Sequence, residues 1–136
     1  MSKKGDIFEI ALAEGTVAFA QALNEPEYAF FSENPIEVQS QLPLFRVWVH
    51  SSAPKNWKKI GNAQPSEALD IEVPRFKKDP INGALSTYIG GHESPATFEQ
   101  VQNMECAAVW EDIHIIDRLA DHLAGRKNQW LESLKP

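Results

Sequence analysis

Apolar residues recur at every second position in several short segments of the first half of the chain, and this spacing constrains the fold most. Residues 6–12 and 16–23 both show it, with a turn at 13–15 between them. Side chains of a β-strand point alternately to its two faces, so this period predicts a hairpin of two half-buried strands. Alternation, or β-branched and aromatic residues between Pro and Gly, predicts further strands at residues 28–31, 44–50, 56–61, 69–73 and 85–89.

Small side chains occupy one face of the second strand. Ala18, Ala20 and Ala22 alternate with larger residues there. Alanine also favours helices, but the alternation favours a strand. We expect another layer to approach the sheet closely at this face.

The pattern becomes helical towards the C-terminus. Thr97 and Gln100 have the spacing of a helix-capping box, and residues 107–110 are typical of a last buried strand. From Asp112 the spacing is that of an amphipathic helix, which Gly125 ends. Its predicted apolar face comprises Ile113, Ile116, Leu119, Ala120 and Leu123, and its predicted polar face His114, Asp117, Arg118, Asp121 and His122.

These segments predict an α+β fold, in which a curled, mostly antiparallel sheet or partly open barrel is covered by the C-terminal helix. The chain has 136 residues, which is typical of one domain. We expect that domain to span residues 1–125, followed by a helical tail at 126–136. The N-terminus resembles no signal peptide and no segment is long and apolar enough for a membrane span, so we expect a cytoplasmic protein.

Acidic residues outnumber basic ones, 19 to 13, and the net charge is −6. Residues 25–37 contain four acids and no base, and residues 93–121 contain seven acids and one arginine. Proteins bind nucleic acids and anionic membranes through their Lys and Arg side chains. An excess of acidic residues therefore disfavours both of these partners and favours a basic one. The two stretches form either one electronegative face or two separate solvated surfaces.

Candidate catalytic groups have simpler structural explanations. Cys106, His114 and Asp117 are not predicted to meet, and a lone cysteine is more often a small buried residue. The neighbouring acids Glu111 and Asp112 fit a helix N-terminus.

A metal site would draw on the carboxylates and imidazoles of the C-terminal third, and a phosphate site on its glycines. Their spacing matches no metal motif, and the glycines lack the residues of a phosphate loop, so we expect no catalytic, metal or cofactor site. The residues in question are His92, Glu111, Asp112, His114 and Asp117 for the metal, and Gly90, Gly91 and His92 for the phosphate.

Several short motifs resemble those of immunity protein family 26, in the same order, over about residues 3–125. They are Lys4–Ile10, Gly15, Ala20–Leu23, Tyr28–Phe31, Trp57–Gly61, Pro74–Pro80, Ala96–Glu99, Met104–Glu105 and Ala108–Glu111. The resemblance implies a cytosolic bacterial protein, encoded beside a polymorphic toxin that is often a nuclease, which binds and neutralises that toxin. It implies no catalytic residue.

A nuclease needs a basic surface, which an acidic protein can cover. The predicted toxin-binding residues are Trp48, Glu111, His114, Asp117 and Asp121. Two alternatives stay open. One is a small-ligand-binding domain or small enzyme with a pocket near Trp48, His50 and His92, and the other is an accessory protein of a mobile element that binds a different protein.

Overall fold

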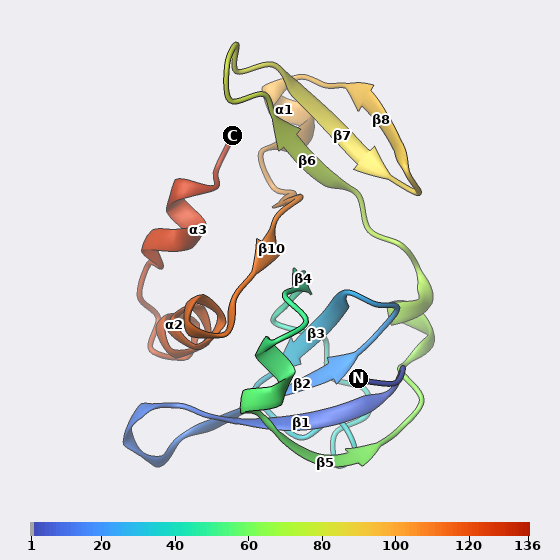
Figure 1. Ribbon diagram of the computed structural model, residues 1–136, viewed down its shortest axis with the longest axis vertical. Helices are drawn as coiled ribbons and strands as arrows, with labels where there is room; N and C mark the ends of the chain where they lie inside the picture. The colour runs from blue at the N-terminus through green and yellow to red at the C-terminus, as the bar shows by residue number, and fades with distance from the viewer. Residues whose placement is uncertain (1) are drawn as a thin grey trace.

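The computed structural model describes residues 2–136 as two mixed sheets with helices packed against them. Figure 1 shows the six-stranded sheet, which we name sheet A, below, and the four-stranded sheet B above. In spatial order, sheet A contains β10 (Val109–Trp110), β4 (Phe45–Val49), β3 (Glu27–Phe31), β2 (Val17–Ala22), β1 (Asp6–Ala11) and β5 (Lys58–Asn62). Sheet B contains β8 (His92–Pro95), β7 (Leu85–Ile89), β6 (Arg75–Lys78) and β9 (Glu105–Cys106).

Most neighbouring strands are antiparallel, as expected. The hairpin β1–β2 pairs Phe8 with Ala20, and its turn is the 3₁₀ helix η1 (Ala13–Gly15). The two parallel pairs are β10 with β4 and β9 with β6. Sheet A ends at β10 on one side and at β5 on the other, so it is open and does not close into a barrel. The mainly antiparallel sheets and the separate helices confirm the predicted α+β class.

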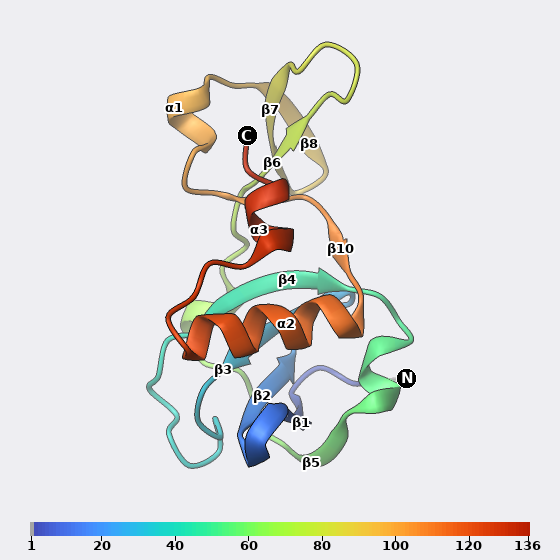
Figure 2. The ribbon, with the colours of Figure 1, turned by 90° about the vertical axis from the view of Figure 1, so that its left-hand side faces the viewer.

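Three α-helices complete the fold, together with the 3₁₀ helices η2 (Ala53–Asn56) and η3 (Glu67–Asp70). The longest, α2 (Asp112–Leu123), lies across sheet A, and α3 (Gln129–Ser133) lies between α2 and sheet B (Figure 2). The short α1 (Phe98–Val101) contacts β7 and begins with the predicted Thr97–Gln100 capping box. Among the described residues, no helix is long and apolar enough to cross a bilayer.

The main core lies between α2 and one face of sheet A. The alanines of β2 are buried there together with Ile115 and Leu119 of α2, which confirms the close approach of a second layer. Trp57 meets three aromatic rings, and Phe30 stacks on Phe45 with 4.9 Å between ring centroids. The other face of sheet A has a smaller core of Leu23, Ala29, Phe31 and Leu69.

The sequence prediction was wrong about residues 69–73, and of the four strands of sheet B it included only β7. A strand was expected at 69–73, but Leu69 is a buried apolar residue of η3. Strands β6 and β8 were missed, because β8 is exposed throughout and β6 buries only Arg75 and Phe76. Polar strands of this kind have no apolar alternation to detect.

The ends of α2 were predicted correctly, but its buried face was not. Ile113 and Leu123 are 63% and 44% exposed, whereas Ile115, Arg118 and Leu119 are buried. Arg118 turns inward because its guanidinium pairs with Glu105, through two hydrogen bonds of 2.9 and 2.6 Å. A paired guanidinium can be buried where an unpaired one cannot.

Candidate functional site

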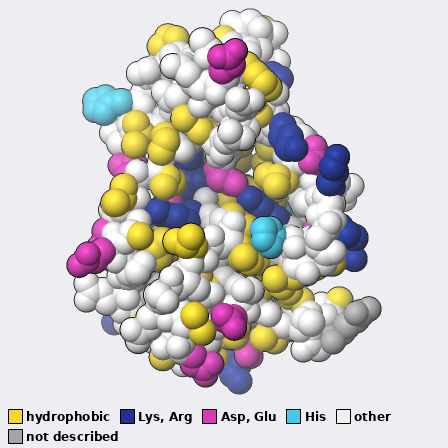
Figure 3. Space-filling view, turned by 180° about the vertical axis from the view of Figure 1, so that it is seen from behind, with side chains coloured by type: hydrophobic (Ala, Val, Ile, Leu, Met, Phe, Trp, Pro, Cys, Tyr) yellow, Lys and Arg dark blue, Asp and Glu magenta, His cyan; other side chains and the backbone are white. Residues whose placement is uncertain are grey.

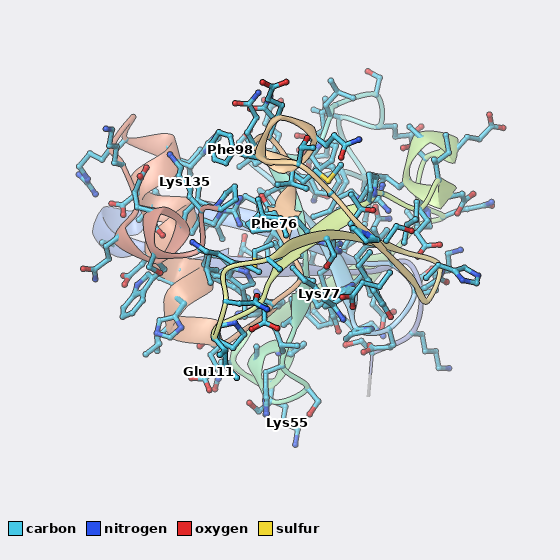
Figure 4. All side chains as sticks on the ribbon, turned by 90° about the horizontal axis from the view of Figure 1, so that it is seen from above. Lys55, Phe76, Lys77, Phe98, Glu111 and Lys135 are labelled. Carbon is cyan, nitrogen blue, oxygen red and sulfur yellow. The ribbon has the colours of Figure 1, made fainter. Side chains whose placement is uncertain are left out.

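The first predicted surface is the outer side of α2. Glu111 occupies the N-cap position of this helix and is exposed, and its side chain makes no capping hydrogen bond. Figure 4 shows Glu111 at the periphery, at the same edge of the molecule as Lys55. The carboxylate of Asp112 accepts a 2.6 Å hydrogen bond from Trp57 Nε1 instead of capping the helix.

The C-terminal segment binds the other predicted residues of this helix. The rings of Trp130 and His114 lie 4.1 Å apart between centroids, and Trp130 Nε1 donates to Asp117 Oδ2 at 3.1 Å. Asp121 accepts from Asn128 at 3.0 Å and from Arg126 at 3.1 Å. The hydrogen bond from Asn128 and the nearby Arg126 cation lower the pKa of Asp121 against a smaller opposing effect of desolvation.

The outer side of α2 is therefore largely occupied by the protein itself. Residues 126–136 place Trp130, Leu131 and Leu134 against the main core, and Asn128 is buried. Of the four predicted helix residues, only Glu111 has no side-chain partner within the described part of the chain.

The second predicted surface surrounds Trp48 on β4. Successive residues of a strand point to opposite faces, and Val47 and Val49 face the core beneath α2. Trp48 therefore projects from the other face of sheet A, where the edge of sheet B approaches it. The structure does not bring Trp48 together with the predicted residues of α2.

A cleft of about 330 Å³ lies beside Trp48, at the junction of the two sheets. Its walls come from the start of β3, from β4, from η3 and the segment after it, and from β6 and β7. Neither His50 nor His92 lines this cleft, although the sequence prediction placed a pocket near both. His50 Nδ1 lies 2.8 Å from Ser52 Oγ, and His92 is exposed on β8.

Two arginines and one glutamate form the inner part of this cleft. The carboxylate of Glu27 binds Arg46 at 3.0 Å and Arg75 at 2.6 Å, and only 15% of its side chain is exposed. Arg46 also donates to the carbonyls of Leu69 and Ile71, and Arg75 donates to that of Arg46. Burial lowers the pKa of Arg75, and Glu27 opposes this effect. We name these three residues the Glu27 triad.

Two aromatic rings line the cleft next to the Glu27 triad. Trp48 and Tyr88 meet edge to face, with 5.8 Å between centroids and an interplanar angle of 88°. Internal cations already lie over both rings, at 4.9 Å for Arg75 over Trp48 and at 4.2 Å for Lys77 over Tyr88. Lys77 projects from β6 on the opposite side to the buried Phe76 (Figure 4). This pair of rings therefore has a geometry that accommodates positive groups.

Carboxylates surround the opening of the cleft. Asp70 pairs with Lys4 at 3.2 Å. Glu25 accepts from the Tyr28 hydroxyl at 3.2 Å, and Glu72 accepts from the backbone N–H of Gly90 at 2.8 Å. Both of these glutamates are exposed, and within the described residues neither has a cation partner.

Cys106 belongs to a different place in the fold. It lines a cleft of about 170 Å³ with Phe76, Leu131 and Leu134, and neither His114 nor Asp117 lines that cleft. Burial and the adjacent Glu105 raise the pKa of its thiol, which disfavours the reactive thiolate. Within residues 2–136, no three His, Cys, Asp or Glu side chains are grouped to hold a metal ion.

The sequence prediction named Trp48, which lines the cleft, but did not include the charged residues around it. Alternation in the strand predicted at residues 44–50 puts Arg46 on the face opposite Phe45 and Val47, and that pattern alone does not distinguish an exposed arginine from a buried, paired one. Arg75 and Tyr88 reach the cleft through sheet B, of which only β7 had been expected.

Comparisons with protein-family models, with characterised proteins and with solved structures find no match to this chain. The resemblance to immunity protein family 26 therefore rests on the sequence motifs alone.

Proposed function

We propose that this protein binds and neutralises a basic protein toxin, a nuclease encoded beside it, by covering the toxin's basic surface. The chain would act by binding, with no catalytic step of its own. The sequence motifs and the net charge of −6 support this proposal, and the arrangement of charges in the fold adds to it.

The observation that carries the proposal is that the arginines are paired within the protein, whereas several exposed acids are not. All four lie in internal ion pairs, with Glu27 for Arg46 and Arg75, with Glu105 for Arg118 and with Asp121 for Arg126. Exposed acids such as Glu25, Glu72 and Glu111 are left without a cation partner among the described residues. Figure 3 shows charged side chains of both signs gathered between the upper and lower parts of one face. A surface with unpaired carboxylates attracts a basic protein and accelerates its association.

Growth of a heterologous host tests this function directly. Each gene flanking the one for this chain is expressed alone and then together with it. We expect one flanking product to stop growth and this chain to restore it. If every toxic flanking product stays toxic in the presence of the folded chain, or none is toxic, the proposal is wrong.

Calorimetry on the purified pair then tests the electrostatic mechanism. Binding driven by charge weakens as salt rises from 50 to 500 mM, because salt screens exposed charges (about 3 Å Debye length at 1 M against 10 Å at 0.1 M). The variants Glu111→Lys and Glu72→Lys separate the outer side of α2 from the Trp48 cleft, since each reverses one exposed charge on a different surface. Affinity that does not change with salt or with either variant would contradict charge-complementary binding.

The cleft beside Trp48 also supports a second candidate function, the binding of a small ligand. A ligand that binds only the native state raises the melting temperature, by an amount that grows with its concentration above Kd. Melting curves with divalent metals and common nucleotides test this alternative. A clear rise with one of these compounds, together with failure of the growth rescue, would favour it over toxin neutralisation.

A further inference from the structure

We propose that the cleft beside Trp48 is the place where the basic partner inserts a lysine or arginine side chain. This inference rests on the proposed function and assigns its anchor point. It places the centre of the interface at the junction of the two sheets and not on the outer side of α2.

The charge of the cleft favours a positive group. Four of its lining residues are acids, Glu25, Glu27, Asp70 and Glu72, and two are arginines. The Nη1 and Nη2 groups of both arginines are directed to Glu27 and to backbone carbonyls, whereas the buried Nε of Arg46 has no partner among the described residues. Lys4 partners Asp70, which leaves Glu25 and Glu72 as the two acids with no cation partner among the described residues.

Both of these glutamates are already oriented. Each uses its Oε1 atom to accept one hydrogen bond, from the Tyr28 hydroxyl for Glu25 and from the Gly90 amide for Glu72. No hydrogen bond within the described chain uses the Oε2 atom of either residue. A carboxylate held in this way loses little side-chain entropy when it binds a cation.

The residue types in the wall are those that dominate binding energy at protein interfaces. Tryptophan, tyrosine and arginine are enriched among such residues, and here Trp48, Tyr88, Arg46 and Arg75 lie around one cleft. Trp48 and Tyr88 are partly exposed, and internal cations show that their rings accommodate positive groups. A guanidinium or ammonium group entering the cleft would meet aromatic rings and free carboxylate oxygens together.

The outer side of α2 offers a partner fewer free side chains than the cleft does. His114, Asp117 and Asp121 are held by Trp130, Asn128 and Arg126, so a partner would have to displace the C-terminal segment to reach them. In the cleft, by contrast, no described side chain binds the Oε2 atom of Glu25 or of Glu72.

A titration with a model side chain tests the cleft without the toxin. The probe is Nα-acetyl-arginine methylamide, and its neutral control is the corresponding citrulline derivative, which has nearly the same shape. The ¹⁵N-labelled full chain contains four tryptophans, and Trp48→Phe assigns the Trp48 indole signal. We expect the arginine probe to shift that signal saturably and the citrulline control to shift it far less.

Two double variants show whether Glu25 and Glu72 are responsible. In Glu25→Gln/Glu72→Gln the amide oxygen can still accept from Tyr28 and Gly90, so the fold is preserved while two charges are lost. We expect this variant to bind the probe about fivefold to tenfold more weakly. The matched control Glu33→Gln/Glu37→Gln removes two exposed charges outside the cleft and should bind as the unmodified chain does.

Equal shifts with the citrulline control, or equal weakening in both double variants, would overturn the inference. The toxin experiment distinguishes this failure from failure of the proposed function. If Glu25→Lys/Glu72→Lys still binds the toxin with unchanged affinity, the anchor is wrong but neutralisation stands. If the probe binds the cleft and no flanking product is neutralised, the cleft stands as a site for cationic ligands and the proposed function is wrong.

Discussion

Sheets A and B are held in the molecule by different forces. Sheet A buries apolar side chains on both faces, beneath α2 on one side and around Leu69 on the other. In sheet B, β8 is fully exposed, and the buried apolar residues are Phe76 on β6 and Val101 on α1. Sheet B is joined to the rest through the contact of Tyr88 with Trp48 and through two ion pairs, Arg75 with Glu27 and Glu105 with Arg118. The large sheet therefore depends on apolar burial, and the small one depends more on its ion pairs, since it buries few apolar side chains.

Removing the carboxylate of the Glu27 triad should have the largest effect. The variant Glu27→Gln leaves Arg46 and Arg75 buried without their counter-ion, which costs about 3–5 kcal/mol. Urea unfolding measures the total loss. Hydrogen exchange should show that amides of sheet B lose protection at lower urea concentration than those of sheet A.

Glu93→Gln is the control, because it removes the charge from the half-exposed pair with Lys77, worth about 0–1 kcal/mol, and its amide oxygen can still accept from Ser86. If Glu27→Gln cost no more than this control, sheet B would not depend on the Glu27 triad.

Opening a cavity beneath α2 should weaken sheet A by a slightly smaller amount. Ile115 is fully buried in the main core, so Ile115→Ala is expected to cost about 2–5 kcal/mol. Protection should fall in sheet A and α2 together. The neighbour Ile113 is 63% exposed, so Ile113→Ala should change stability by no more than about 0.5 kcal/mol. Similar losses in the two variants would show that the buried face of α2 is assigned incorrectly.

Removing the N-cap of α1, which contacts β7, should lower the stability of the sheet B region without affecting sheet A. Thr97 accepts a hydrogen bond from the amide of Gln100, and Thr97→Ala should cost about 1 kcal/mol. Thr97→Ser keeps the hydroxyl and should restore most of the stability in thermal melts. Exchange rates in sheet A would be unchanged, whereas faster exchange there would show that the two sheets unfold as one unit.

An effect of similar size at neutral pH concerns the hydroxyl of Tyr28, at the edge of the main core. Burial, and then the nearby Glu25 carboxylate, raise the pKa of Tyr28 to about 12 from 10.0, although a hydrogen bond with Ser2 opposes the shift. Because the pKa of Tyr28 is higher in the folded chain than in the unfolded one, its protonated hydroxyl contributes to folding stability. That contribution is complete below pH 10 and is lost as pH rises from 10 to about 12. Tyr28→Phe should cost about 1 kcal/mol at pH 7 and make the decline above pH 10 shallower. Urea midpoints at pH 7, 10 and 11.5 measure both effects, and an unchanged slope would contradict the assignment.

These differences explain how far the sequence predicts the fold. The alternation of Phe8, Ile10 and Val47 reports burial, and burial is what holds sheet A, so its strands could be found. Sheet B is held by particular pairs of charges, and neither Arg75 nor Arg118 differs in sequence pattern from an exposed arginine.

The candidate site shows the same limit. Trp48 was found because an aromatic residue within an alternating strand stands out. The acids of the opening could not be placed around it, since Glu25 and Glu72 line one cleft only when η3 and sheet B fold against β4. Likewise, periodicity cannot show that His114 and Asp117 are covered by the C-terminal segment.

The pairing of β10 with β4 affects the order in which sheet A can be completed during synthesis. Strands β1 to β4 pair with neighbours close in sequence, so their sheet can form soon after residue 50 has been synthesised. The outer edge of β4 receives its partner only when Val109 and Trp110 have been made. Until then that edge exposes unpaired N–H and C=O groups, which can pair with another chain. The nascent protein is therefore most prone to aggregate in this interval, before its last strand and α2 are available to cover the sheet.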